Sequence, residues 1–204
     1  MLIRKFLLFI SIIFILLGKC NADDLWQNSR AEVNHDNLKC YQYANASILI
    51  DSSLSSESGA NIFINAENNS CTTSPTKVYS LADFPDVSGR NLFFKGVLGN
   101  YLLLDDGCCP GIRNILIYDL KSHQQLSVIT YLADDVLPSP RVKGGKLYFW
   151  QVDSTSNLKH CKRNQQAELN DESLVFAKNY VLNLQKKPFK KKQLNLSGIC
   201  RYTQ

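Results

Sequence analysis

Cysteine is the residue type with the clearest potential for chemistry in this sequence. Seven are present in 204 residues. The first, Cys20, lies in an N-terminal segment that we expect to be removed. The six that remain are Cys40, Cys71, Cys108, Cys109, Cys161 and Cys200. An even set in an exported chain predicts three disulfide bonds.

The positions of the cysteines suggest how they pair. Cys40 and Cys71 flank the first pair of expected strands, so we expect them to bond to each other. We expect Cys161 to bond to either Cys108 or Cys109, because both inserts follow a similar strand, and Cys200 to take the other one. A bond between the adjacent Cys108 and Cys109 is the strained alternative.

A metal site is the other chemistry that these cysteines could support. Cys108, Cys109, His160 and Cys161 could together supply soft ligands. Adjacent cysteines are poor ligands for one tetrahedral ion, however, and the sequence has no C-x-x-C motif. We therefore predict no metal and no cofactor.

Paired acids end two of the apolar runs, at Asp105-Asp106 and Asp134-Asp135. With one histidine, Asp105 and Asp106 could form the acid and base of a small secreted hydrolase. Neighbouring strand residues point to opposite faces, so adjacent acids do not naturally converge. Turn residues are the simpler interpretation, and we predict no catalytic residue.

A basic segment near the C-terminus has the sequence K-K-P-F-K-K-K. Its predicted binding residues are Lys186, Lys187, Phe189, Lys190, Lys191 and Lys192. This pattern predicts a hairpin tip that contacts a protein or an anionic envelope or glycan surface. A solvated turn that protects a sheet edge is the alternative. We expect no nucleic-acid partner, since the chain is exported and no stacking platform is apparent.

Ser88-Gly89-Arg90 is similar to the inserting loop of periplasmic lysozyme inhibitors. The resemblance covers three residues, and Asn91 stands where a tyrosine would be expected. It implies an inhibitor of a hydrolase such as lysozyme, with Ser88 and Arg90 as contacts. Arg113, which ends the Gly107–Arg113 loop, is a further candidate contact. A simple turn is the alternative.

The N-terminal residues have the pattern of an export signal. Arg4 and Lys5 precede an apolar core over residues 6–17, and small residues favour cleavage after Ala22. We therefore predict a cleaved signal peptide over 1–22 and a single β-rich exported domain over 23–204, secreted or periplasmic. Lipidation of Cys20 is the alternative.

Removal of this signal peptide also changes the charge. It carries three basic residues and no acid, so its loss lowers the formal net charge from +5 to +2. No second apolar stretch is long enough to cross a membrane, so we do not expect a membrane-spanning protein.

The elements that must position these residues are β-strands. Tyr101–Leu104 is a short apolar run between turn residues, which favours a strand buried on both faces. Asn114–Leu120 and Leu126–Leu132 predict a hairpin, and Gly107–Gly111 a loop. Asp24–Val33 gives a weak indication of one short helix.

A weak repeat follows this stretch. Val142–Trp150 echoes Val97–Leu104, and Tyr180–Leu184 echoes Ile115–Leu120. Such strand-plus-hairpin units resemble blades of a β-propeller. We therefore predict an all-β fold of antiparallel, disulfide-bridged sheets, arranged as a partial propeller or a sandwich. The preferred function is a non-catalytic binding protein; the hydrolase inhibitor and the small hydrolase are the alternatives.

Overall fold

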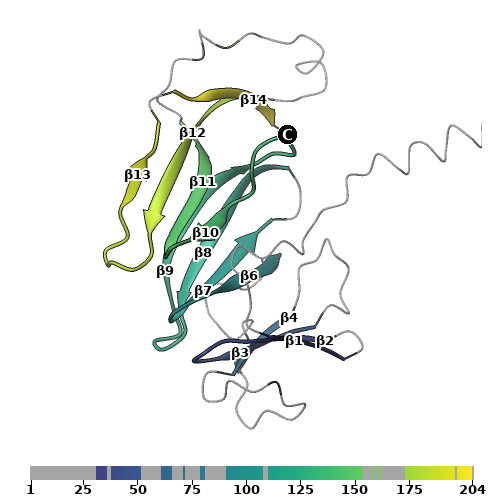
Figure 1. Cartoon of the computed structure of the whole chain (residues 1–204). Coiled ribbons are helices and arrows are strands. Elements are labelled where there is room, and N and C mark those ends of the chain that lie inside the picture. Colours follow the sequence, from purple (N-terminus) through teal and green to yellow (C-terminus); the bar gives the residue numbers. More distant parts are fainter. Residues whose placement is uncertain are drawn as a thin grey trace, which may run out of the picture.

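Three antiparallel β-sheets account for the regular structure in the part of the chain that the computed structural model describes (Figure 1). The described residues are 31–35, 38–51, 61–65, 71, 79–80, 91–107, 110–153, 158, 161, 173–195 and 197–203. Their regular elements are all strands, and disulfide bonds join parts of the chain. The predicted all-β, disulfide-bridged fold is therefore confirmed.

Two of the sheets are meanders in which consecutive strands lie side by side, and in the third sheet the last strand pairs with the strand two before it. The first sheet contains β1 (Ala31–His35), β2 (Leu38–Gln42), β3 (Ser47–Asp51), β4 (Asn61–Asn65) and β5 (Tyr79–Ser80). The central sheet contains β6 (Leu92–Leu98), β7 (Tyr101–Asp106), β8 (Gly111–Asp119) and β9 (Gln124–Ala133). The third sheet contains β10 (Arg141–Lys143), β11 (Lys146–Val152), β12 (Ser173–Asn183), β13 (Lys191–Gln193) and β14 (Ile199–Thr203).

The central sheet is buried on both faces. Leu102 and Leu104 pack into a core shared with the first sheet, whereas Leu103 packs into a second core shared with the third sheet. All three side chains are 0% exposed. Successive strand residues point to opposite faces, so one continuous apolar run supplies both cores. The prediction made from Tyr101–Leu104 is confirmed.

A β-bulge in β6 keeps this alternation in register. Phe94 pairs with Leu104 and Gly96 with Leu103, which leaves Lys95 as the extra residue. After the bulge, Val97 pairs with Leu102 and enters the first core. The bulge therefore places a lysine beside the end of the second core without moving the next apolar residue out of the first.

Two disulfide bonds join described residues. Cys40–Cys71 matches the prediction. The second bond joins Cys161 to Cys200, so the expected bonds from these two cysteines to Cys108 and Cys109 are wrong. The reason is that β14 returns to pair with β12, where Phe176 lies opposite Cys200. Cys108 and Cys109 lie outside the described residues.

The repeat has a counterpart in the arrangement of turns. Gly99-Asn100 joins β6 to β7, and Gly144-Gly145 joins β10 to β11, as the aligned segments predict. Each repeat therefore includes one strand more than the unit read from the sequence. The propeller-like interpretation stays a prediction.

The expected helix over Asp24–Val33 is wrong over its last three residues, and residues 24–30 lie outside the described residues. Ala31–His35, which overlaps the expected helix, forms strand β1 and pairs along its whole length with β2. Backbone hydrogen bonds to a neighbouring strand outweigh a weak local preference for helix.

The predicted signal peptide, with Cys20, lies within residues 1–30 and so outside the described residues. Across the described part of the chain, no helix has the length and apolar character needed to cross a membrane. The two disulfide bonds fit an extracellular or periplasmic location.

The two-sided burial of β7 leads to a stability prediction. Replacing Leu103 with alanine leaves a cavity in the second core and should lower the free energy of unfolding by about 2–5 kcal/mol. Val136 is 75% exposed, so Val136→Ala should change it by less than about 0.5 kcal/mol. Urea denaturation of both variants measures the difference. A cost for Leu103→Ala as small as that of Val136→Ala would contradict the burial of β7 on both faces.

Candidate functional site

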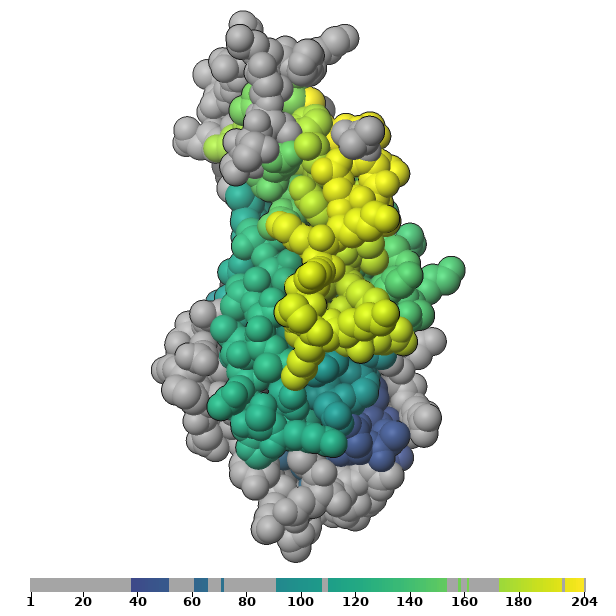
Figure 2. Space-filling model, turned by 90° about the vertical axis from the view of Figure 1, so that its left-hand side faces the viewer, coloured from purple at the N-terminus to yellow at the C-terminus, as the bar shows by residue number. Residues whose placement is uncertain are grey.

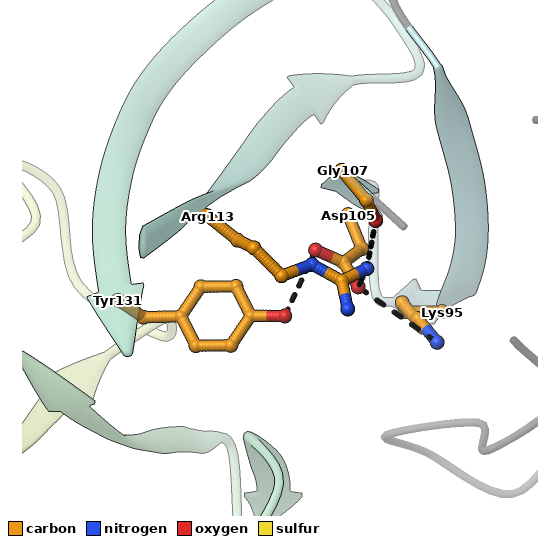
Figure 3. A network of polar contacts seen from close by, with 5 residues as sticks. All are labelled: Lys95, Asp105, Gly107, Arg113 and Tyr131. Atoms are coloured by element: carbon orange, nitrogen blue, oxygen red, sulfur yellow. Dashed lines mark hydrogen bonds and ion pairs between the residues drawn. The ribbon is translucent and has the colours of Figure 1, made fainter. Parts of the chain in front are cut away.

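A buried polar cluster closes one end of the second core (Figure 3). Its centre is Asp105, which is only 1% exposed. The Tyr131 hydroxyl donates a hydrogen bond of 2.9 Å to Asp105 Oδ1. Arg113 Nη2 donates to Asp105 Oδ2, and Lys95 Nζ lies 3.9 Å from the same oxygen. One carboxylate therefore contacts side chains from the three other strands of the central sheet.

The pairing of the strands explains why these residues meet. Arg113 on β8 lies directly opposite Tyr131 on β9. Asp105 on β7 lies opposite Ile115, which is two residues beyond Arg113 and therefore on the same face of β8. Asp105, Arg113 and Tyr131 share the face that carries the second core. The bulge at Lys95 adds the fourth member from β6.

Gly107 completes the cluster through its backbone. Its carbonyl oxygen accepts a second hydrogen bond from Arg113 Nη2. The φ angle of Gly107 is +125°, and a Cβ atom there would lie 3.2 Å from Arg113 Cγ. Only glycine combines this backbone conformation with space for the arginine side chain.

Burial raises the pKa of the Asp105 carboxyl, and this effect outweighs the charges of Arg113 and Lys95 and the hydrogen bonds from Tyr131 and Arg113, which lower it. The carboxyl group is enclosed by its own protein partners. The cluster therefore ties four strands together, and it does not present an acid or a base to an external substrate.

Among the described residues, the two acids of the hydrolase hypothesis lie far from His123. Asp106 pairs with Asn114 at one end of β7 and β8, and Tyr101 pairs with Asp119 at the other. His123 lies beyond that second end, in the turn between β8 and β9. The two ends of β7 are about 17 Å apart. His160 is outside the described residues.

Lysines from three turns form the second candidate site. Figure 2 shows the yellow-green atoms of the C-terminal strands lying against the teal and green atoms of the central sheet. We define the lysine surface as the exposed residues Lys121, Lys143, Lys146, Lys186, Lys187 and Lys190. They lie in or beside the turns β8–β9, β10–β11 and β12–β13.

Contacts from the β12–β13 turn connect it to the central sheet. Lys187 Nζ lies 3.2 Å from Asp119 Oδ2 and 5.2 Å from the centre of the Tyr101 ring. The ring of Phe189 packs edge-on against Tyr101, with 5.3 Å between ring centres. Lys187 and Phe189 therefore hold the tip of the predicted basic hairpin in a fixed position.

The same turn also contacts the β10–β11 turn. The Leu184 N–H donates a hydrogen bond of 3.0 Å to the Gly145 carbonyl. Gly145 has a φ of +72°, and a Cβ atom there would lie 2.4 Å from Gln185 Nε2. A glycine at this position allows the two turns to approach so closely.

Asp119 is the acidic partner within this group. Burial raises the pKa of its carboxyl, but the backbone N–H of Lys121 and the ammonium group of Lys187 together outweigh that effect, and the net shift is downward. Asp119 therefore keeps its negative charge at neutral pH and holds Lys187 in place.

The other predicted site residues are distributed differently. Ser88 and Arg90 lie outside the described residues. Arg113 belongs to the buried cluster, with 14% of its side chain exposed. Lys191 donates a hydrogen bond of 2.6 Å to Gln151 Oε1, and Lys192 is exposed on β13. The roles of all these residues in binding stay predictions.

Sequence reasoning missed Lys121, Lys143 and Lys146 as parts of a site. Each lies in or beside a turn, and the glycine pair between Lys143 and Lys146 is a recognisable turn signal. The sequence does not show that their turns lie next to residues 186–190, which are 40 or more positions further along the chain.

Searches of protein-family models, curated proteins and solved structures found no match to this chain. Among the described residues, no three His, Cys, Asp or Glu side chains form a group suited to hold a metal ion. The lysine surface is the candidate site that is open to an external ligand.

The raised pKa of Asp105 leads to a prediction about pH. The folded protein retains the Asp105 proton above the ordinary pKa of 3.8, whereas the unfolded chain loses it there. The stability that this proton confers is therefore complete below about pH 4 and is lost as the pH rises through the folded-state pKa. We expect the unfolding free energy of the wild type, relative to Asp105→Asn, to fall over this range.

Urea denaturation of the two proteins between pH 3.5 and pH 8 measures this difference. The asparagine variant serves as the control, because it lacks the titrating group and keeps the shape of the side chain. If the wild type instead gains stability relative to the variant as the pH rises, Arg113 and Lys95 dominate the titration of Asp105 and the stated direction is wrong.

Proposed function

We propose that this protein is an exported, non-catalytic binding protein that holds a polyanionic ligand on its lysine surface. The observation that carries the proposal is the meeting of three turns from two sheets, all of which present lysine. Asp119 is the only acidic residue in these turns and the residues next to them, and Lys187 already neutralises it.

Two opposed lysines in the β10–β11 hairpin favour ligand binding over the alternative of a merely solvated turn. Lys143 lies directly opposite Lys146 in the pairing of the two strands, and both are exposed. Like charges at directly opposed positions destabilise a strand pair. An anion bound between them would remove that repulsion, so the arrangement fits a protein whose ligand is negatively charged.

The fixed position of the β12–β13 turn also favours binding. Lys187 and Phe189 are held against Asp119 and Tyr101, so their backbone is ordered before a ligand arrives. A preorganised site loses less conformational entropy on binding than a flexible one. Lys186 and Lys190 flank these contacts and are exposed to solvent.

Export is the second part of the proposal. The supporting observations are the two disulfide bonds, which fit an oxidising compartment, and the signal-peptide pattern over residues 1–22. Outside the cytoplasm, the anionic partners available to such a surface include glycans, envelope polymers and acidic proteins.

A charge-removal experiment tests the lysine surface. A lysine close to an anionic surface contributes about 1 kcal/mol to binding, so Lys190→Gln should weaken binding to inorganic polyphosphate about fivefold. The variant with glutamine at Lys143, Lys146, Lys186 and Lys190 should bind at least a hundredfold more weakly. Titration calorimetry at about 0.15 M salt, where the Debye length is about 8 Å, measures both affinities.

Lys39→Gln is the matched control, because it removes the same charge from β2 in the first sheet. Its affinity should stay within about twofold of the wild type, since charges beyond one Debye length are largely screened. If Lys39→Gln and Lys190→Gln weaken binding equally, net charge governs the interaction and the lysine surface is not the site.

Export and processing can be tested on the protein recovered from the producing cells. Intact mass spectrometry should give a chain that begins at Asp23, since cleavage is expected after Ala22. A chain that begins at a lipid-modified Cys20 would replace the soluble form with a membrane-tethered one. A chain that still begins at Met1 would contradict processing altogether.

A further inference from the structure

The outer face of the third sheet combines aromatic rings with positive charge. Leu147 and Phe149 on β11 are buried in the second core, so the alternate residues Lys146, Tyr148 and Trp150 lie on the opposite face. Both rings are half-buried, which leaves part of each open to solvent. This face contributes nothing to either core.

The strand pairing arranges basic residues around the two rings. Tyr148 lies opposite Arg141 on β10 and Val181 on β12, and Val181 lies opposite Lys192 on β13. The Arg141 guanidinium lies 5.9 Å from the centre of the Tyr148 ring. Arg141 and Lys192 are exposed.

Each outward-facing residue of β11 forms a row with the residues opposite it on the neighbouring strands. The row of Lys146, toward the turns, adds positive charge, and the row of Trp150, on the other side of Tyr148, adds the second ring. Lys146 lies opposite Lys143 and Asn183, so this row belongs to the lysine surface. Trp150 lies opposite Asn179. None of the paired positions in the three rows is acidic. The aromatic face and the lysine surface are therefore continuous along β11.

We propose that this face binds an acidic polysaccharide that carries carboxylate groups, with Tyr148 and Trp150 stacking on sugar rings and Arg141, Lys146 and Lys192 contacting the carboxylates. This inference rests on the proposed polyanion-binding function and specifies its ligand class. The two rings are about 7 Å apart along the strand, and both can contact one extended chain.

The chemistry separates this ligand class from simpler polyanions. Lysines alone attract any anionic polymer, but a solvent-facing tyrosine and tryptophan on one strand offer flat, rigid apolar surfaces at low entropic cost. The C–H face of a sugar ring fits such a surface. A planar guanidinium can bind a carboxylate through two parallel hydrogen bonds, and Arg141 lies beside one of the rings.

The test compares two polymers, polygalacturonate and inorganic polyphosphate, of which only the first has sugar rings. We expect Tyr148→Thr and Trp150→Thr each to weaken binding to polygalacturonate at least about fivefold. Their binding to polyphosphate should stay within about twofold of the wild type. Threonine retains a strong preference for strands, and Tyr202→Thr on β14 controls for the loss of a half-buried ring elsewhere in the same sheet.

The outcomes distinguish this inference from the proposed function. If the wild type binds polyphosphate but not polygalacturonate, or if both ring variants bind polygalacturonate as the wild type does, the polysaccharide assignment is wrong while polyanion binding stands. If the wild type binds neither polymer at low salt, both proposals are overturned. Weaker polygalacturonate binding by the ring variants alone, with Tyr202→Thr unaffected, supports the assignment.

Discussion

Burial of both faces of the central sheet is the constraint on which the rest of the structure depends. Every second residue of β7 enters one core and its neighbour enters the other, so the strand has no solvent-facing side. The charged groups that nevertheless occur there, Lys95 and Asp105, lie at one end of the sheet. The Asp105 carboxylate is tolerated because Arg113, Tyr131 and Lys95 supply the contacts that water would otherwise provide.

Much of this architecture could be predicted, because the signals that encode it are local. The continuous apolar run Tyr101–Leu104 indicates two-sided burial, and the strand pair between Cys40 and Cys71 explains their bond. The pairing of Cys161 with Cys200 depends on the return of β14 to β12, a non-local contact that spacing does not reveal. Lys95 similarly reaches Asp105 through a bulge, which breaks the alternation that sequence analysis assumes.

The same distinction applies to the candidate site. The run of basic residues over 186–192 is apparent in the sequence because its members are neighbours. Lys143 and Lys146 look like ordinary turn residues until the Leu184–Gly145 hydrogen bond places their turn beside that run. The sequence also gives no reason to expect that Lys187 and Phe189 serve to anchor the turn, because their partners Asp119 and Tyr101 come from another sheet.

The Cys161–Cys200 bond has a consequence for the integrity of the chain. It closes a covalent ring across 39 positions, and this ring includes β12, β13 and the basic turn. A protease that cuts one peptide bond inside the ring opens it but does not divide the molecule, because the bridge still joins the two pieces. A single nick inside the ring therefore leaves every strand of the third sheet covalently joined to the rest of the chain.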